Sequence, residues 1–106
     1  MRTGTYTDQE ILNGIQYQDN RILLFVYRKN FSPVKYYIKK NNGSDKDAED
    51  VFQDAMILIY NKVQEGNMAL KCSVHTYLFS VVQILWLRQL DFQNKRKFEQ
   101  FGSIRI

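Results

Sequence analysis

The sequence predicts an all-α fold, a compact bundle of about four helices. Apolar residues recur through most of the chain at the three- and four-residue spacing of amphipathic helices, and cap residues precede these runs. No stretch shows the alternation of apolar and polar residues that marks a half-buried strand. The 106 residues, 44% of them hydrophobic, suffice for one domain with a core, so we expect a single helical domain over residues 1–106.

The N-terminal third predicts two helices, each introduced by a cap. Thr7 and Glu10 have the form of a capping box, and apolar residues at helical spacing follow, which predicts a first helix to about Tyr17. Asp19 is placed to cap a second helix, whose narrow apolar stripe runs to Asn30 beside several cations.

The only proline leaves the course of this second helix open. Ser32 and Pro33 supply a cap and a first-turn proline, so the chain either restarts a helix here or continues with an offset to Lys40. We expect Lys39 and Lys40 to end the helix with cations at its negative end, and Gly43 to make the turn that follows.

Residues 44–66 predict one capped helix with two different faces. Ser44 and Asp47 form its capping box and Gly66 ends it. One face is the structural face and comprises Ala48, Val51, Phe52, Ala55, Ile59 and Val63. The other carries Asp47, Asp50, Gln53, Asp54, Ile57 and Tyr60. That second face suits a partner protein with basic residues around an apolar centre; the alternative is a solvated acidic face with two exposed hydrophobic residues.

Ser73 is placed to cap the last long helix, which is apolar nearly all round in its upper half. The predicted core stripe comprises Val74, Tyr77, Leu78, Val81, Leu85 and Phe92. Trp86 lies off that stripe, yet we expect it in the core, covered by another helix. After Leu90 the chain turns basic, and residues 98–106 carry no clear fold signal.

Composition and motifs argue against catalysis and bound cofactors. A single cysteine, Cys72, excludes an internal disulfide and multi-cysteine metal sites, and the only histidine, His75, lacks a neighbouring ligand pattern. The glycines are scattered and form no phosphate-binding loop. We therefore expect no enzyme, no metal and no cofactor. The N-terminus has no apolar signal core and no run is long enough to span a bilayer, so we expect a cytoplasmic protein.

Residues 71–97 combine hydroxyls, amides, aromatic rings and cations, the side chains that bind single-stranded nucleic acid. A formal net charge of +4 permits such a partner. The alternative is that the aromatic residues belong to the core. The candidate DNA-binding residues are Lys71, Ser73, His75, Thr76, Ser80, Gln83, Arg88, Lys95 and Arg96.

The run Asp-Ala-Glu-Asp-Val-Phe-Gln-Asp at residues 47–54 resembles region two of extracytoplasmic-function (ECF) RNA polymerase sigma factors. The resemblance extends from about Asp8 to Arg96, with the family's spacing between helices. It implies the region-two fold and a contact with the beta-prime clamp of core RNA polymerase. The residues that would make this contact are Asp47, Glu49, Asp50, Gln53, Asp54 and Ile57.

The resemblance also covers the helix that contacts melted minus-ten promoter DNA in this family. Residues 77–84 match its hydrophobic positions, but Gln83 and Ile84 replace the family's Arg-Asn pair, and residues 70–73 take the place of its base-holding loop. Region four, the family's C-terminal helix-turn-helix domain, has no counterpart, which indicates an excised domain or an atypical member.

The leading hypothesis is a sigma region-two domain that binds core RNA polymerase and recognises or helps to melt minus-ten DNA. An anti-sigma factor is a further candidate partner. The alternative hypothesis, motivated by Gln83 and Ile84, is a protein-interaction module of the same fold that binds no DNA.

Overall fold

The computed structural model describes residues 5–66, 68 and 70–104, with side chains as far as Gln93. Within these residues the chain forms four helices and no strand, which confirms the predicted all-α bundle. The helices are α1 (Asp8–Gln16), α2 (Asn20–Lys40), α3 (Asp45–Gln64) and α4 (Val74–Ile104).

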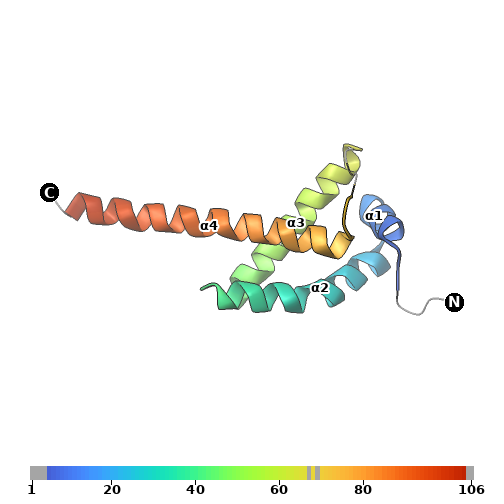
Figure 1. The fold of residues 1–106 in the computed structure, drawn as a ribbon, viewed down its shortest axis with the longest axis horizontal. Coiled ribbons are helices and arrows are strands. Elements are labelled where there is room, and N and C mark those ends of the chain that lie inside the picture. The colour runs from blue at the N-terminus through green and yellow to red at the C-terminus, as the bar shows by residue number, and fades with distance from the viewer. Residues whose placement is uncertain (1–4, 67, 69, 105–106) are drawn as a thin grey trace.

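The helices pack as a short bundle from which one helix projects. The helices α2, α3 and α4 contact one another, and α1 closes one end of the bundle against all three. Figure 1 shows α3 crossing behind α4 from the C-terminal end of α2, and the second half of α4 extending well beyond the other helices. This projection makes the molecule elongated, with extents of 67 × 28 × 23 Å.

The predicted caps begin the first three helices. The Thr7 amide donates to Glu10 Oε1 (2.8 Å) and the Glu10 amide donates to Thr7 Oγ1 (3.1 Å). The same reciprocal pair links Ser44 and Asp47 at 2.9 and 3.0 Å. Asp19 accepts from the backbone amide of Arg21 at 3.0 Å. These caps satisfy amides that the first turn of a helix otherwise leaves without a partner.

Of the two courses left open at Pro33, the chain takes the continuous one, because α2 runs unbroken from Asn20 to Lys40. Proline has no amide hydrogen, so it forgoes one helical hydrogen bond in mid-helix. The buried stripe nevertheless continues past it, from Ile22 and Val26 to Val34 and Ile38. Burial of that stripe against α3 and α4 offsets the loss.

The core confirms the structural face predicted for α3, since all six of its residues are buried. The α4 stripe is partly wrong. Val82 and Trp86 are buried, Trp86 at 1% exposure, whereas Phe92 is 60% exposed. Figure 1 shows that the second half of α4 runs beyond the other three helices. The expected core position of Trp86 is confirmed.

Gly43 has a different task from the one predicted. The residue with positive φ in the α2–α3 turn is Asn42 (φ 72°), while the Gly43 amide donates to the Ile38 carbonyl at 2.8 Å. A Cβ on Gly43 would collide with Ile38 and would lie 2.9 Å from the Trp86 ring. The Trp86 Nε1–H also donates to the Asn41 carbonyl at 3.0 Å, so this turn is fitted to the indole.

The C-terminal segment, where the sequence carries no clear fold signal, is helical as far as Ile104. Residues 91–101 contain no proline or glycine, so nothing in that stretch interrupts a helix that is already formed. None of the helices in the described ranges combines the length and the apolar character needed to cross a bilayer.

Candidate binding grooves

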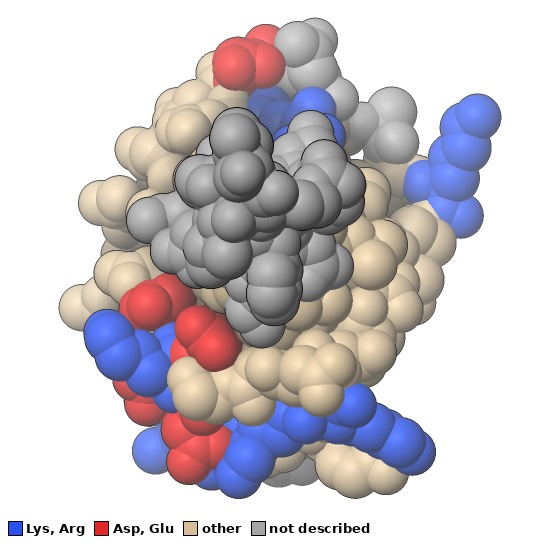
Figure 2. Space-filling view, turned by 90° about the vertical axis from the view of Figure 1, so that its left-hand side faces the viewer, with Lys and Arg blue, Asp and Glu red and all other residues tan. Residues whose placement is uncertain are grey.

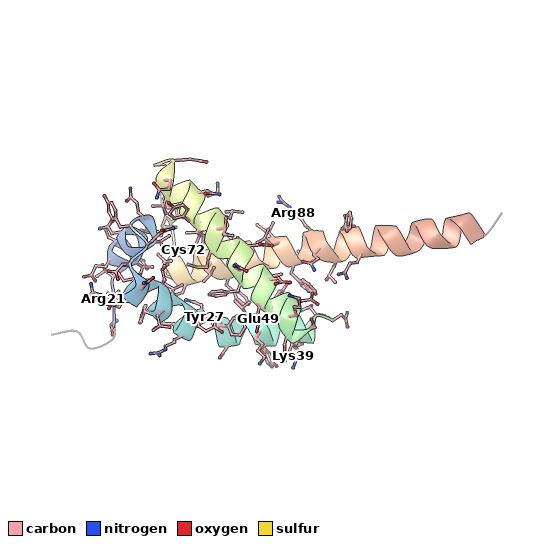
Figure 3. All side chains as sticks on the ribbon, turned by 180° about the vertical axis from the view of Figure 1, so that it is seen from behind. Arg21, Tyr27, Lys39, Glu49, Cys72 and Arg88 are labelled. Carbon is pink, nitrogen blue, oxygen red and sulfur yellow. The ribbon has the colours of Figure 1, made fainter. Side chains whose placement is uncertain are left out.

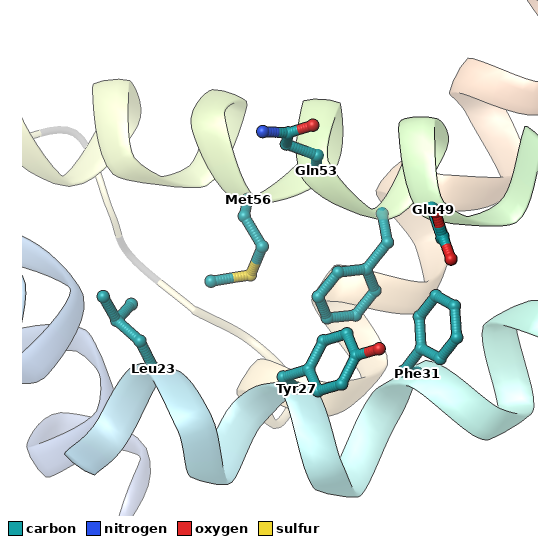
Figure 4. A pocket seen from close by; sticks show the side chains of 7 residues that line it. Leu23, Tyr27, Phe31, Glu49, Gln53 and Met56 are labelled. Atoms are coloured by element: carbon teal, nitrogen blue, oxygen red, sulfur yellow. The ribbon is translucent and has the colours of Figure 1, made fainter. Parts of the chain in front are cut away.

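An apolar groove of about 420 Å³ lies between α2 and α3 (Figure 4). Its floor is aromatic: Tyr27 stacks on Phe31 with ring centroids 4.9 Å apart, and both rings meet Phe52 edge-on at 5.6 Å. Tyr27 is 45% exposed, which is high for so large a ring. The residues of this α2–α3 groove are Leu23, Tyr27, Phe31, Glu49, Phe52, Gln53 and Met56.

A second hollow extends the α2–α3 groove along α3 toward α1. The two share Leu23, Gln53 and Met56, and the extension adds Ile57 and Tyr60. Ile57 is 53% exposed. Of the residues predicted for the second face of α3, Gln53, Ile57 and Tyr60 thus border one continuous channel with an apolar floor.

The structure divides the six predicted polymerase-binding residues into three groups. Glu49 and Gln53 line the groove itself, and Ile57 lines its extension. Asp50 and Asp54 are exposed outside it, Asp50 at 3.7 Å from the Lys46 ammonium. Asp47 is engaged in the Ser44 capping box.

Two lysines of α2 form ion pairs with Asp45, the first residue of α3. Lys39 Nζ lies 3.0 Å from Asp45 Oδ1, and Lys35 Nζ lies 3.9 Å from the same oxygen. The hydrogen bond from Lys39 lowers the pKa of the Asp45 carboxyl. Figure 2 shows basic side chains along the lower edge of the molecule, where α2 lies, with acidic ones grouped beside them.

A separate groove of about 370 Å³ lies between α2 and the first half of α4. It brings together four of the nine predicted DNA-binding residues, His75, Thr76, Ser80 and Gln83. Hydroxyl, amide and imidazole groups therefore stand beside apolar side chains. The residues of this α2–α4 groove are Asn30, Pro33, Val34, His75, Thr76, Leu78, Phe79, Ser80 and Gln83.

Hydrogen bonds fix the positions of polar side chains in the α2–α4 groove. The Ser80 hydroxyl donates to the Thr76 carbonyl at 3.0 Å. Asn30 is 8% exposed; its Nδ2 donates to the Val26 carbonyl at 2.9 Å and its amide group meets His75 Nδ1. Burial lowers the pKa of His75, Lys29 lowers it further, and Asp8 acts in the opposite direction. The imidazole is therefore biased toward its neutral form.

The other predicted DNA-binding residues lie outside this groove. Ser73 caps α4, as expected, by accepting from the Thr76 amide at 3.1 Å. Lys71 is exposed in the preceding loop. Figure 3 shows Arg88 pointing from α4 away from α2. The side chains of Lys95 and Arg96 fall outside the described residues.

The residues that α2 contributes to the two grooves were not predicted from the sequence. Tyr27 and Phe31 were not singled out for the first groove, nor Asn30 and Pro33 for the second. One signal was present: α2 carries more large apolar residues than its stripe can bury, so some must face another way. Which neighbour they would border could not be read from α2 alone.

The described residues include Cys72, His75 and several carboxylates. No group of three or more His, Cys, Asp or Glu side chains there could hold a metal ion. Cys72 is exposed, and the Nδ1 of His75 is occupied by Asn30 and not by the thiol.

The chain is thus an all-α bundle with open grooves on two sides of α2. The family model for sigma-70 region 2 matches residues 26–96, which is more than half of the chain, and the chain belongs to this family. It is therefore a sigma-factor domain with a role in transcription initiation, from a family of transcription factors that are not enzymes. Neither the curated proteins nor the solved structures gave a match to this chain. The ECF subtype stays a prediction.

Proposed function

We propose that this domain binds core RNA polymerase through the α2–α3 groove and minus-ten promoter DNA through the α2–α4 groove. The observation that carries the proposal is the position of the two grooves on different sides of α2, within a chain matched to sigma-70 region 2. One helix would then hold polymerase and promoter in a fixed relation. The domain acts by binding alone, without a cofactor.

The chemistry of the α2–α3 groove supports a protein partner. The aromatic floor, with the exposed ring of Tyr27, offers apolar area, and Glu49 at its edge with Asp50 and Asp54 beyond offers negative charge. A partner helix that carries an apolar residue flanked by Lys or Arg would complement both features. The clamp of the polymerase beta-prime subunit, implied by the resemblance of residues 47–54, is the partner we assign.

The chemistry of the α2–α4 groove supports an unpaired DNA strand. Its apolar walls, which include Phe79, give unstacked bases a surface, and Thr76, Ser80 and Gln83 give hydrogen-bonding groups at its edge. Cations near the groove, such as Lys29, attract phosphates. Binding of the opened strand in preference to the duplex would stabilise the melted promoter.

Capture of core RNA polymerase by the immobilised domain tests the first half of the proposal. Glu49→Lys with Gln53→Ala reverses one charge and removes one amide in the groove, and we expect capture to be lost. The matched control is Glu65→Lys with Gln93→Ala, which makes the same changes at exposed positions away from the groove. Equal capture by both variants would remove the assignment of this groove.

Fluorescence anisotropy with a labelled single strand of minus-ten sequence tests the second half. We expect Ser80→Ala with Gln83→Ala to weaken binding, and the affinity of the unaltered domain to fall steeply between about 50 and 200 mM salt as phosphate counterions are displaced. A duplex of the same sequence should bind less tightly.

One observation favours the alternative of a protein-interaction module that binds no DNA. Ile84, which takes the family's Asn position, is 51% exposed and is better suited to an apolar protein contact than to a phosphate. If this alternative is correct, the domain captures polymerase or a regulator such as an anti-sigma factor, yet binds no single strand even at low salt.

A further inference from the structure

A third hollow, of about 530 Å³, lies on α2 outside both grooves and is covered on one side by the N-terminal segment. Three cations and two aromatic rings line it. Figure 3 shows Arg21 at the end of α2 next to α1, with Lys39 at the opposite end of the helix. The residues of this α2 recess are Tyr6, Arg21, Leu24, Phe25, Arg28 and Lys29.

The cations of the recess are only partly neutralised. Arg21 pairs with Asp19, with Nη2 3.2 Å from Oδ2. Arg28 and Lys29 are exposed and form no ion pair with any carboxylate of the described residues. The recess therefore carries an excess of positive charge at the mouth of a concave surface, which favours an anionic ligand.

The aromatic side of the recess is ordered by ring contacts. Tyr6 meets Phe25 edge-on with centroids 4.9 Å apart, and Lys29 Nζ lies 6.0 Å from the centroid of the Phe25 ring. A ligand held here meets flat apolar groups and ammonium or guanidinium groups together. This pairing suits a nucleotide, whose base and sugar contact rings while its phosphate meets cations.

The recess adjoins the α2–α4 groove. The rings of Phe25, in the recess, and His75, in the groove, are 6.2 Å apart. Lys29 lies in the recess and acts electrostatically on His75. A strand that leaves the groove past His75 would therefore be near Lys29 and the other cations of the recess.

We propose that the α2 recess binds a nucleotide of the unpaired strand next to the part held in the α2–α4 groove. Arg28 and Lys29 hold the phosphate, and Tyr6 and Phe25 face the base or sugar. The inference rests on the proposed DNA-binding function of that groove. A free nucleotide offers the same chemistry, so the experiment must separate the two sources.

The test uses the full chain and a fluorescein-labelled strand of about 12 thymidines, which lies within the usual site size of single-strand binding domains. The recess variant is Arg28→Gln with Lys29→Gln. The control is Lys40→Gln with Lys62→Gln, which removes the same charge from exposed positions outside the recess. Because each phosphate contact on a single strand contributes about 0.7 to the slope of log affinity against log salt, the recess variant should lose about 1.4 from that slope. The control should lose much less.

Each outcome decides between sites. Equal slopes for the recess and control variants would refute strand binding at the recess. Weakened binding by Ser80→Ala with Gln83→Ala in the same assay would still support strand binding at the α2–α4 groove. Loss of slope in the recess variant with no effect of the groove variant would support the recess and overturn the groove. Micromolar binding of free thymidine monophosphate that is lost in the recess variant, with an unchanged slope for the strand in that variant, would assign a free-nucleotide site and overturn the strand proposal. No binding by the unaltered chain at low salt overturns both.

Discussion

Trp86 provides the most direct test of how the bundle is held together. Its side chain is 1% exposed, packs beside Gly43 in the α2–α3 turn, and donates from Nε1 to the Asn41 carbonyl at 3.0 Å. Truncation to alanine removes the largest buried side chain among the described residues and leaves that carbonyl without its donor. Both losses act on the junction of α2, α3 and α4.

The size of the effect follows from the burial. Trp→Ala changes in a core cost about 3 to 5 kcal/mol, a range that includes the cavity left behind. The free energy of unfolding of an ordinary domain is about 5 to 15 kcal/mol, so Trp86→Ala should leave the folded state only slightly more stable than the unfolded chain. At roughly 4 °C for each kcal/mol in a chain of this size, the melting temperature should fall by about 12 to 20 °C.

Urea and thermal unfolding followed by circular dichroism measure this change. Leu87→Ala, at the next position, is the matched control because Leu87 is 60% exposed and its truncation should cost about 0.5 kcal/mol or less. Trp86→Phe should fall between the two, since it keeps one ring and loses the indole donor. A Trp86→Ala protein that melts within a few degrees of the unaltered chain would refute the assignment of Trp86 to the core.

Three further predictions concern the turns and the titration of the only histidine. Gly43→Ala should destabilise by about 1 to 3 kcal/mol because its methyl group would overlap Ile38 and Trp86; urea midpoints equal to those of the unaltered chain would contradict this. Gly66→Ala should cost about 1 kcal/mol through its positive φ (75°) alone, since the space around it is open, and a stabilised variant would show that reasoning to be wrong. Burial is the main cause that lowers the pKa of His75 in the folded protein, so the unfolded chain binds the proton more readily. The contribution of His75 to the free energy of unfolding is therefore complete above the unfolded pKa of 6.5, and it is lost as the pH falls through the folded pKa. Melting curves from pH 7.5 to 5 should therefore show a loss that His75→Gln reduces, and an identical loss in both proteins would exclude His75 as its source.

The sequence by itself determined the features that depend on near neighbours along the chain. Thr7 and Ser44 make their capping boxes with residues three positions ahead, and Asp19 caps with a residue two positions ahead. The buried face of α3 follows from helical spacing and agrees at every position. The run at residues 47–54 also carried enough family pattern for the fold type to be inferred, and the family match confirms it.

The tertiary structure alone decided what covers each face. The sequence predicts that Gly43 makes the turn, but the positive φ lies at Asn42. In the fold, the missing side chain of Gly43 leaves room for Trp86, which is 43 positions away. The grooves likewise combine residues of α2 with residues of α3 or α4. The place of Tyr27 in one groove depends on α3, and the place of Asn30 in the other depends on α4. Helical periodicity states which residues share a face, because that depends on the backbone of one helix; which neighbour meets the face depends on packing between helices, which the spacing of residues within one helix does not encode.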